Sequence, residues 1–183
     1  MMLNLMKKIG KATAQEVRAI GANWHLPQTL GLPQNERWGR TYECFSETSE
    51  ISSKLGATLI EGMQGDLSSQ YAIATAKHYI GEGIAKNGIN QGDIDGKLFE
   101  KELEELLIPY RKAIASGVKS VMVTYSSIDG VKCHENKNLI TDILKGDLGF
   151  KGIVITDYNV QIKQVEVLNK EKIEKLSMQE WIC

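Results

Sequence analysis

Apolar residues recur along this chain with two alternating spacings, one typical of helices and one typical of strands. Helical spacing occurs in residues 9–20, again around Leu55, and most clearly in residues 97–116. Between these segments lie short stretches whose apolar positions either alternate or run together, as they do in strands. The predicted strands are residues 22–26, 71–81, 118–125 and 152–157, and a further short helix is expected at residues 138–146.

The segment 97–116 carries the clearest helical pattern. Asp95 precedes it at the position of an N-cap, and Gly117 follows it as a C-terminal stop. Pro109 lies inside the segment. Because proline removes a backbone hydrogen bond and clashes with the preceding turn, we expect a kink or a break there.

Strands and helices alternate along most of the chain, which predicts an α/β fold with a parallel sheet covered by helices. The sequence shows neither an internal repeat nor a low-complexity linker. The pattern changes after residue 160, where residues 161–183 are charged, compatible with helix and without a clear strand.

Composition restricts the classes of function. The 183 residues are 42% hydrophobic with a formal net charge of -1, which gives no electrostatic footprint for nucleic acid or an anionic membrane. No apolar run reaches membrane-spanning length, and the first residues place their charges after the apolar positions, the reverse of a secretory signal. We therefore expect a cytoplasmic protein with neither a nucleic-acid nor a membrane partner.

The cysteines argue against a metal centre or a disulfide framework. Cys44, Cys133 and Cys183 are odd in number and lack the spacing of a zinc site. We expect reduced thiols, no metal and no cofactor.

Reactive side chains follow three of the predicted strands. Lys77 and His78 lie near the end of the predicted strand 71–81, and Tyr125 ends the predicted strand 118–125. Asp157 ends the predicted strand 152–157, and Tyr158 directly follows it. In a (β/α)8 barrel the carboxyl ends of the strands together form the active site. The recurrence of polar residues at these ends therefore predicts one shared pocket.

Each of these residues also has a purely structural interpretation. The Lys77–His78 pair suits a solvated strand exit, Tyr125 suits a core position with a hydrated hydroxyl, and Asp157 suits the N-cap of a following helix. A lysine at a strand end is also compatible with a Schiff-base aldolase, since a desolvated lysine can form an imine.

The loop NERWGRTYECFSE, residues 35–47, adds two arginines around Trp38. Taken alone, Arg37 and Arg40 fit a structural salt-bridge corner better than a clamp for hydroxyls or carboxylates.

Four segments in order resemble the N-terminal domain of glycoside hydrolase family 3, above all its β-glucosidases and β-glucan exohydrolases. They are NERWGRTYECFSE, ATAKHYIGEG, the stretch from Gly117 to Gly152, and IVITDYN. The resemblance runs from about residue 8 to residue 159. It implies a partial (β/α)8 TIM-like barrel, because a full barrel takes about 250 residues and only about four strands are predicted here.

The resemblance also implies the roles of individual residues. It places the catalytic nucleophile at Asp157 and replaces the usual tryptophan beside it with Tyr158. The positions that line the subsite of the cleaved sugar are Arg40, Lys77, His78 and Tyr125.

The implied function is a retaining, β-glucosidase-like hydrolysis of β-linked glucosides or oligosaccharides. Such an enzyme needs one ionised carboxylate as nucleophile and one protonated carboxyl group as acid. In the family's β-glucosidases the acid belongs to a second domain, and Glu82 is the only local candidate here. The alternative is therefore a catalytically inert fragment that lacks its acid/base domain.

Some positions depart from the family pattern. Pro27-Gln28 replaces Ala-Pro, and Gly83-Ile84-Ala85 replaces Gly-Gly-Thr. The stretch YIGEG lacks the second histidine of the family's N-acetylhexosaminidases, which disfavours that subfamily.

We expect residues 1–160 to form a fragment of the family's barrel domain and residues 161–183 to form a divergent tail. Relatives continue past the nucleophile to a segment similar to Asn-Ala-Gly-Met-Asp-Met. One set of codons for Met178–Cys183, read one nucleotide out of register, encodes that hexapeptide. We hypothesise that the tail is translated out of frame.

We also expect the exposed strand edges of an incomplete barrel to favour association.

Overall fold

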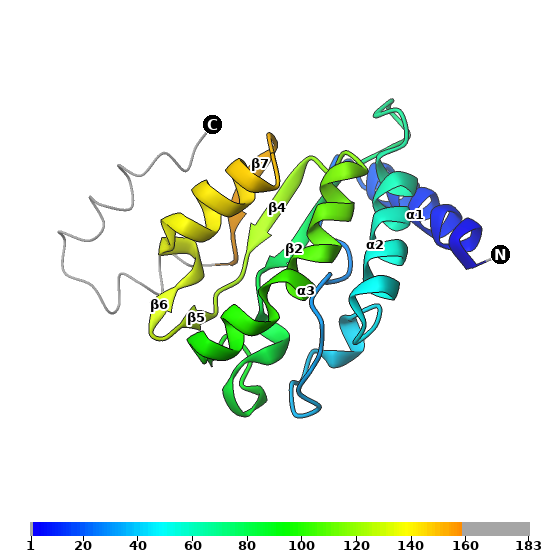
Figure 1. The fold of residues 1–183 in the computed structure, drawn as a ribbon. Helices are drawn as coiled ribbons and strands as arrows, with labels where there is room; N and C mark the ends of the chain where they lie inside the picture. Colours follow the sequence, from blue (N-terminus) through cyan, green and yellow to red (C-terminus); the bar gives the residue numbers. More distant parts are fainter. Residues whose placement is uncertain (1, 159–183) are drawn as a thin grey trace.

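The computed structural model describes residues 2–158. Its centre is a four-stranded sheet in the order β1-β2-β4-β7, in which every neighbouring pair is parallel (Figure 1). The strands are β1 (Trp24–His25), β2 (Ile73–Tyr79), β4 (Ser120–Val123) and β7 (Ile153–Thr156). All four lie within segments that the sequence predicts to be strands.

A helix connects each strand of this sheet to the next, and a further helix precedes the first strand. The helices are α1 (Met2–Ala19), α2 (Ser49–Gln64), α3 (Gly96–Ala115) and η5 (Asn138–Asp147), the last with π-helical hydrogen bonding. Because the strands follow one another in chain order and crossovers have one hand, the connecting helices lie on the same face of the sheet (Figure 1). This is the arrangement of part of a (β/α)8 barrel, since a doubly wound sheet reverses its strand order. The α/β class and the partial barrel are confirmed.

The main core lies between the sheet and its helices. Alternate strand residues point into it, among them Ala74, Ala76, Val121 and Val123. The opposite face, which would line the inside of a barrel, carries Trp24, whose indole Nε1 donates to Thr75 Oγ1 at 2.7 Å. Within residues 2–158, Trp24 keeps 37% of its surface exposed and Ile153, at the other edge, keeps 42%.

The ends of α3 form as the sequence predicts. The Asp95 carboxylate accepts a hydrogen bond from the Leu98 N–H at 3.0 Å, and Gly117 adopts a φ of +79° just after the helix. The expected break at Pro109 is wrong, because α3 continues through it as one helix. Pro109 is buried, and packing of α3 against α2 supports the helix around the missing hydrogen bond.

A small second sheet lies beyond the carboxyl ends of β2 and β4. It pairs β3 (Asp93–Ile94) in parallel with β5 (Ser127–Ile128), which pairs antiparallel with β6 (Val131–Lys132). Short 3-10 helices complete the loops, namely η1 (Thr41–Glu43), η2 (Glu82–Ile84), η3 (Lys86–Gly88) and η4 (Cys133–Glu135). The sequence pattern predicts none of these elements.

Two further expectations concern the limits of the chain and the membrane. The divergent tail at residues 161–183 lies outside the described residues. Among residues 2–158, no helix has the length and apolar character needed to cross a membrane.

Candidate active site

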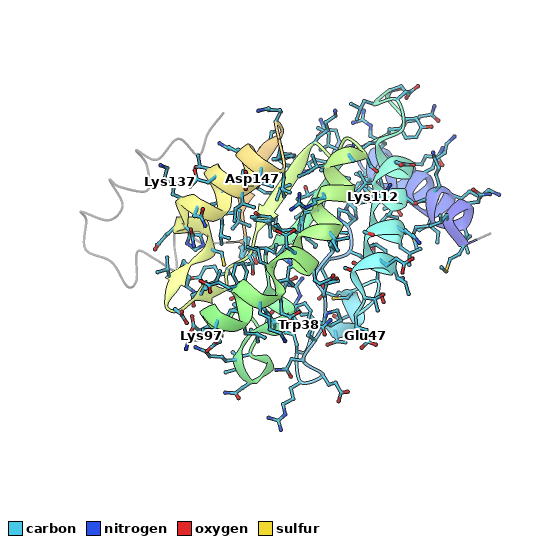
Figure 2. The ribbon with its side chains drawn as sticks, in the orientation of Figure 1. Trp38, Glu47, Lys97, Lys112, Lys137 and Asp147 are labelled. Carbon is cyan, nitrogen blue, oxygen red and sulfur yellow. The ribbon has the colours of Figure 1, made fainter. Side chains whose placement is uncertain are left out.

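The loop between β1 and α2 is fixed at the carboxyl end of the sheet by Trp38. This side chain is 1% exposed, and its indole Nε1 donates to Asn90 Oδ1 at 3.2 Å (Figure 2). The backbone of Gly88 lies so close to this loop that a Cβ atom on Gly88 would be 2.7 Å from the backbone nitrogen of Trp38. This anchoring brings the next loop residues, including Arg40, over the end of β2.

The guanidinium of Arg40 contacts Glu43 on one edge and His78 on the other. Its Nε and Nη2 donate to the two carboxylate oxygens of Glu43 at 2.8 and 2.7 Å. The hydrogen bonds between the two raise the pKa of Arg40 and lower the pKa of Glu43. The third nitrogen, Nη1, lies 3.5 Å from His78 Nε2. The salt-bridge interpretation is therefore correct for one edge of Arg40, while the other edge faces the strand end.

His78 and Glu82 form a buried pair behind this contact. His78 Nδ1 lies 2.8 Å from Glu82 Oε1, and both residues are 3% exposed. Thr29 Oγ1 lies 2.7 Å from the same carboxylate oxygen. Glu82, the local candidate for the acid, is thus enclosed by protein groups and is not placed to protonate a leaving group.

Lys77 precedes this pair in the irregular end of β2, where the register against β4 shifts between Ala76 and Tyr79. Burial lowers the pKa of Lys77, and the nearby Arg40 cation lowers it further. The carboxylates that oppose this effect are Glu43, Glu82 and Asp157.

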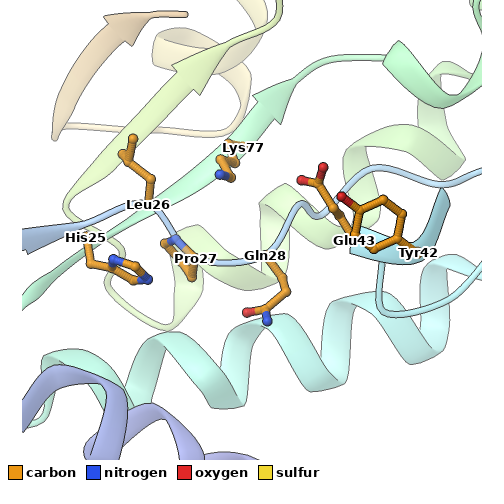
Figure 3. A pocket seen from close by; sticks show the side chains of 7 residues that line it. All are labelled: His25, Leu26, Pro27, Gln28, Tyr42, Glu43 and Lys77. Carbon is orange, nitrogen blue, oxygen red and sulfur yellow. The ribbon is translucent and has the colours of Figure 1, made fainter. Parts of the chain in front are cut away.

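A cavity of about 300 Å³ lies at the carboxyl ends of β1 and β2 (Figure 3). Lys77 and Glu43 both line it (Figure 3). The other lining residues are His25, Leu26, Pro27, Gln28 and Tyr42. Burial and the Lys77 cation lower the pKa of His25. The cavity therefore presents one cation and one carboxylate beside an apolar rim.

Asp157 directly follows the carboxyl end of β7. The pKa of Arg40 is raised mainly by its hydrogen bond with Glu43 and that of Lys77 is lowered mainly by burial, and the Asp157 carboxylate makes only a minor contribution that favours the charged form of each. Its Oδ1 accepts from the Tyr158 N–H at 2.6 Å. Tyr158 itself is 78% exposed. The alternative role of Asp157 as a helix cap concerns residues after 158, outside the described part of the chain.

Tyr125 follows β4 and packs toward the small second sheet. Lys132 Nζ lies 4.3 Å from the centre of the Tyr125 ring, and the His134 ring centre lies 5.8 Å away. Burial, together with Lys132, lowers the pKa of His134 to about 4. These contacts fix Tyr125 beside the strand ends, and its place in a sugar subsite stays a prediction.

Of the two carboxylates at this site, Glu43 is not singled out by the sequence pattern, and Glu82 is considered there only as a candidate acid and not as a partner of His78. Glu43 lies three residues after Arg40 and Glu82 four residues after His78, which are spacings at which side chains meet within a helical turn. Arg40 caps the 3-10 helix η1 that contains Glu43, whereas His78 lies in strand β2 and Glu82 begins η2, so the spacing becomes informative only once the local structure is known.

The described residues show no group of three or more histidine, cysteine or acidic side chains suited to hold a metal ion. Cys44 and Cys133 are free, and burial raises the pKa of each thiol to about 12. Cys183 lies outside the described residues.

Comparison with known proteins places this chain beside carbohydrate-active enzymes. The family described as "Glycosyl hydrolase family 3 N terminal domain" matches residues 1–178. A β-xylosidase of Formosa agariphila is 37% identical over 162 residues, covering 85% of this chain and 22% of that protein. A probable β-glucosidase F of Neosartorya fischeri is 34% identical over 160 residues, covering 85% and 18%.

Solved structures agree with the sequence relatives. An exo-1,3/1,4-β-glucanase from a Pseudoalteromonas species superimposes with a TM-score of 0.81 at 40% identity, over 85% of this chain and 20% of that one. A β-glucosidase of Listeria innocua in complex with glucose gives a TM-score of 0.79 at 29% identity, over 84% and 22%. The chain thus spans about a fifth of the length of these relatives.

Proposed function

Because this chain belongs to glycosyl hydrolase family 3, we propose that its site acts on β-linked glucosides by a retaining mechanism with Asp157 as the nucleophile. The observation that carries the proposal is the grouping of charge at the strand ends. Asp157 follows the carboxyl end of β7 and Lys77 lies at the carboxyl end of β2 in the same parallel sheet, where Arg40 Nη1 lies 3.5 Å from His78 Nε2. A carboxylate beside two cations is suited to attack while other donors hold the sugar.

In the proposed reaction, an Asp157 oxygen attacks the anomeric carbon of the β-glucoside. The bond to the leaving-group oxygen breaks, and that oxygen takes a proton from a general acid. Water then hydrolyses the resulting glycosyl ester, which frees the sugar with its original configuration and regenerates the Asp157 carboxylate.

The neighbouring side chains would bind the sugar. Lys77 offers an ammonium group in the cavity, and Arg40 retains one guanidinium nitrogen that Glu43 does not occupy. Both groups can donate to sugar hydroxyls. The exposed ring of Tyr158 offers an apolar face for the pyranose, while Tyr125 would close the side toward β4.

The nearest carboxylates do not supply the acid. Glu43 is held by two hydrogen bonds from Arg40, which lower its pKa and keep it ionised. Glu82 is enclosed behind His78. We infer that the acid comes from a part of the enzyme beyond residues 2–158. General acid catalysis contributes about 10²–10⁴-fold, so the chain alone should not hydrolyse cellobiose at a useful rate.

An activated substrate tests this proposal. A dinitrophenyl 2-fluoro-β-glucoside has a leaving group that departs without acid assistance, so the chain should release up to one equivalent of dinitrophenolate. Asp157→Asn should abolish that release. Hydrolysis of cellobiose by the purified chain that depends on Asp157 would instead show that the acid lies within it.

An inert remnant is the second candidate, favoured by the exposed inner face of the sheet at Trp24 and Ile153. It predicts no release of dinitrophenolate.

The lowered pKa of Lys77 is also compatible with a Schiff-base aldolase. Borohydride trapping with a keto acid would modify Lys77 only in that case.

A further inference from the structure

We propose that Glu82 is a positioning residue that fixes the tautomer of His78, so that Nε2 of the histidine accepts a hydrogen bond in the sugar subsite. The role of His78 in that subsite rests on the proposed function. The tautomer itself does not depend on it, because it follows from the groups that surround the ring.

The first constraint acts at Nδ1. Glu82 Oε1 lies 2.8 Å from this nitrogen, and both side chains are almost fully buried. A carboxylate can only accept hydrogen bonds, so we infer that Nδ1 carries the proton in this contact. Burial removes the water that could otherwise serve as an alternative partner for either group.

The second constraint acts at the opposite nitrogen. Arg40 Nη1 lies 3.5 Å from His78 Nε2, and a guanidinium can only donate. A lone pair at Nε2 suits this neighbour, whereas a proton there would face another N–H. Glu82 and Arg40 therefore favour the same tautomer from the two sides of the ring, and they also face each other, since Arg40 Nη1 lies 4.0 Å from Glu82 Oε2.

The carboxylate is itself held in place. Thr29 Oγ1 contacts Glu82 Oε1 at 2.7 Å, and the Gly31 N–H donates to that hydroxyl at 3.0 Å. A Cβ atom at Gly31 would lie 3.1 Å from Glu82 Oε1, and one at Gly83 would clash with the Leu32 carbonyl oxygen. The chain around residues 29–33 thus packs closely against Glu82 and restricts its side chain.

This arrangement gives the subsite a mixed hydrogen-bonding character. Lys77 and Arg40 can only donate, whereas the Nε2 atom of His78 accepts. A sugar hydroxyl that displaces the long Arg40 contact can donate to Nε2 while it accepts from one of the cations, and a group without a proton cannot do both. Glu82 would therefore favour a free hydroxyl at this position of the sugar.

Nitrogen NMR of the imidazole rings tests the inference directly. The sequence contains three histidines, so the His78 signals can be assigned by their loss in His78→Gln. We expect neutral His78 in the whole chain to carry its proton on Nδ1. Glu82→Gln, which keeps the size but adds a donor, should produce a measurable population protonated on Nε2.

Glu47→Gln is the matched control. Glu47 is an exposed glutamate (Figure 2), and its backbone oxygen, not its carboxylate, accepts from Gln34. This variant removes the same charge and should leave the His78 tautomer unchanged. A wild-type His78 protonated on Nε2 would overturn the inference, even if Glu82→Gln failed to fold.

A second readout separates this inference from the proposed function. Glu82→Gln should slow the release of dinitrophenolate from the activated glucoside by roughly tenfold, as expected for a misplaced hydrogen bond, with most of the effect on sugar affinity. Wild-type chain that releases none but shows the Nδ1–H tautomer would refute the function and leave the positioning role intact. Equal release by Glu82→Gln and wild type would refute the positioning role in the subsite.

Discussion

At the scale of single residues, the site depends on carboxylates that hold other side chains. Glu43 occupies two nitrogens of Arg40, and Glu82 occupies one nitrogen of His78. These contacts leave Arg40 Nη1 and His78 Nε2, which lie 3.5 Å apart at the end of β2. The sequence, through its family resemblance, identifies Arg40 and His78 but does not identify the groups that orient them.

The Arg40–Glu43 pair should make stability depend on pH. Its hydrogen bonds lower the pKa of Glu43 below the value of 4.5 that a glutamate has in an unfolded chain. The contribution is therefore complete above that value and is lost as the pH falls through the lower folded pKa. Glu43→Gln should cost about 1 kcal/mol at pH 7.

Urea unfolding of wild type and Glu43→Gln at pH 7 and at about pH 3 measures this difference. The gap in unfolding free energy should narrow at the acidic pH. A gap that is equal at both values would mean that the ionised pair does not contribute to stability.

At the scale of elements, regular periodicity decides what the sequence can predict. The helices α2 and α3 and the strands β2, β4 and β7 each repeat a pattern over enough residues to be recognised. Strands β3, β5 and β6 have two residues each and, unlike the equally short β1, they do not lie within a longer alternating segment that the pattern predicts. The small second sheet, and with it the surroundings of Tyr125, therefore emerges only from the three-dimensional structure.

The N-cap of α3 gives a prediction at this scale. Asp95→Ala removes the acceptor of the Leu98 N–H and should lower the free energy of unfolding by about 1 kcal/mol. Lys101→Ala, on the exposed surface of the same helix, should change it by less than about 0.5 kcal/mol. Equal losses in chemical denaturation would show that the cap contributes nothing specific.

At the scale of the whole molecule, the described residues form an arc of a barrel whose inner face is exposed at its edges, at Trp24 and Ile153, while Thr75 and Met122 between them are buried. Family resemblance and strand order both indicate this partial barrel before side-chain contacts are considered. The exposure of Trp24 and Ile153 cannot be read from a pattern, because their neighbours in space come from distant parts of the chain. Such a face, together with unpaired strand edges, favours association.

We predict that the chain associates in a concentration-dependent manner during size-exclusion chromatography. Ile153→Lys places a charge on the inner face at the β7 edge and should shift the chain toward the monomer. Ile20→Lys changes a residue that is 83% exposed and lies outside the sheet, and it should leave the elution volume unchanged. A compact monomer at every concentration would contradict this prediction.

The central claim is that Asp157 is the nucleophile of a sugar site that it shares with Lys77 and Arg40. Its most direct test is peptide mapping by mass spectrometry after incubation of the chain with the dinitrophenyl 2-fluoro-β-glucoside. The account predicts one fluoroglucosyl group, attached to Asp157 and absent from Asp157→Asn. A label on Glu43 or on any other residue, or no label on the wild-type chain, would contradict it.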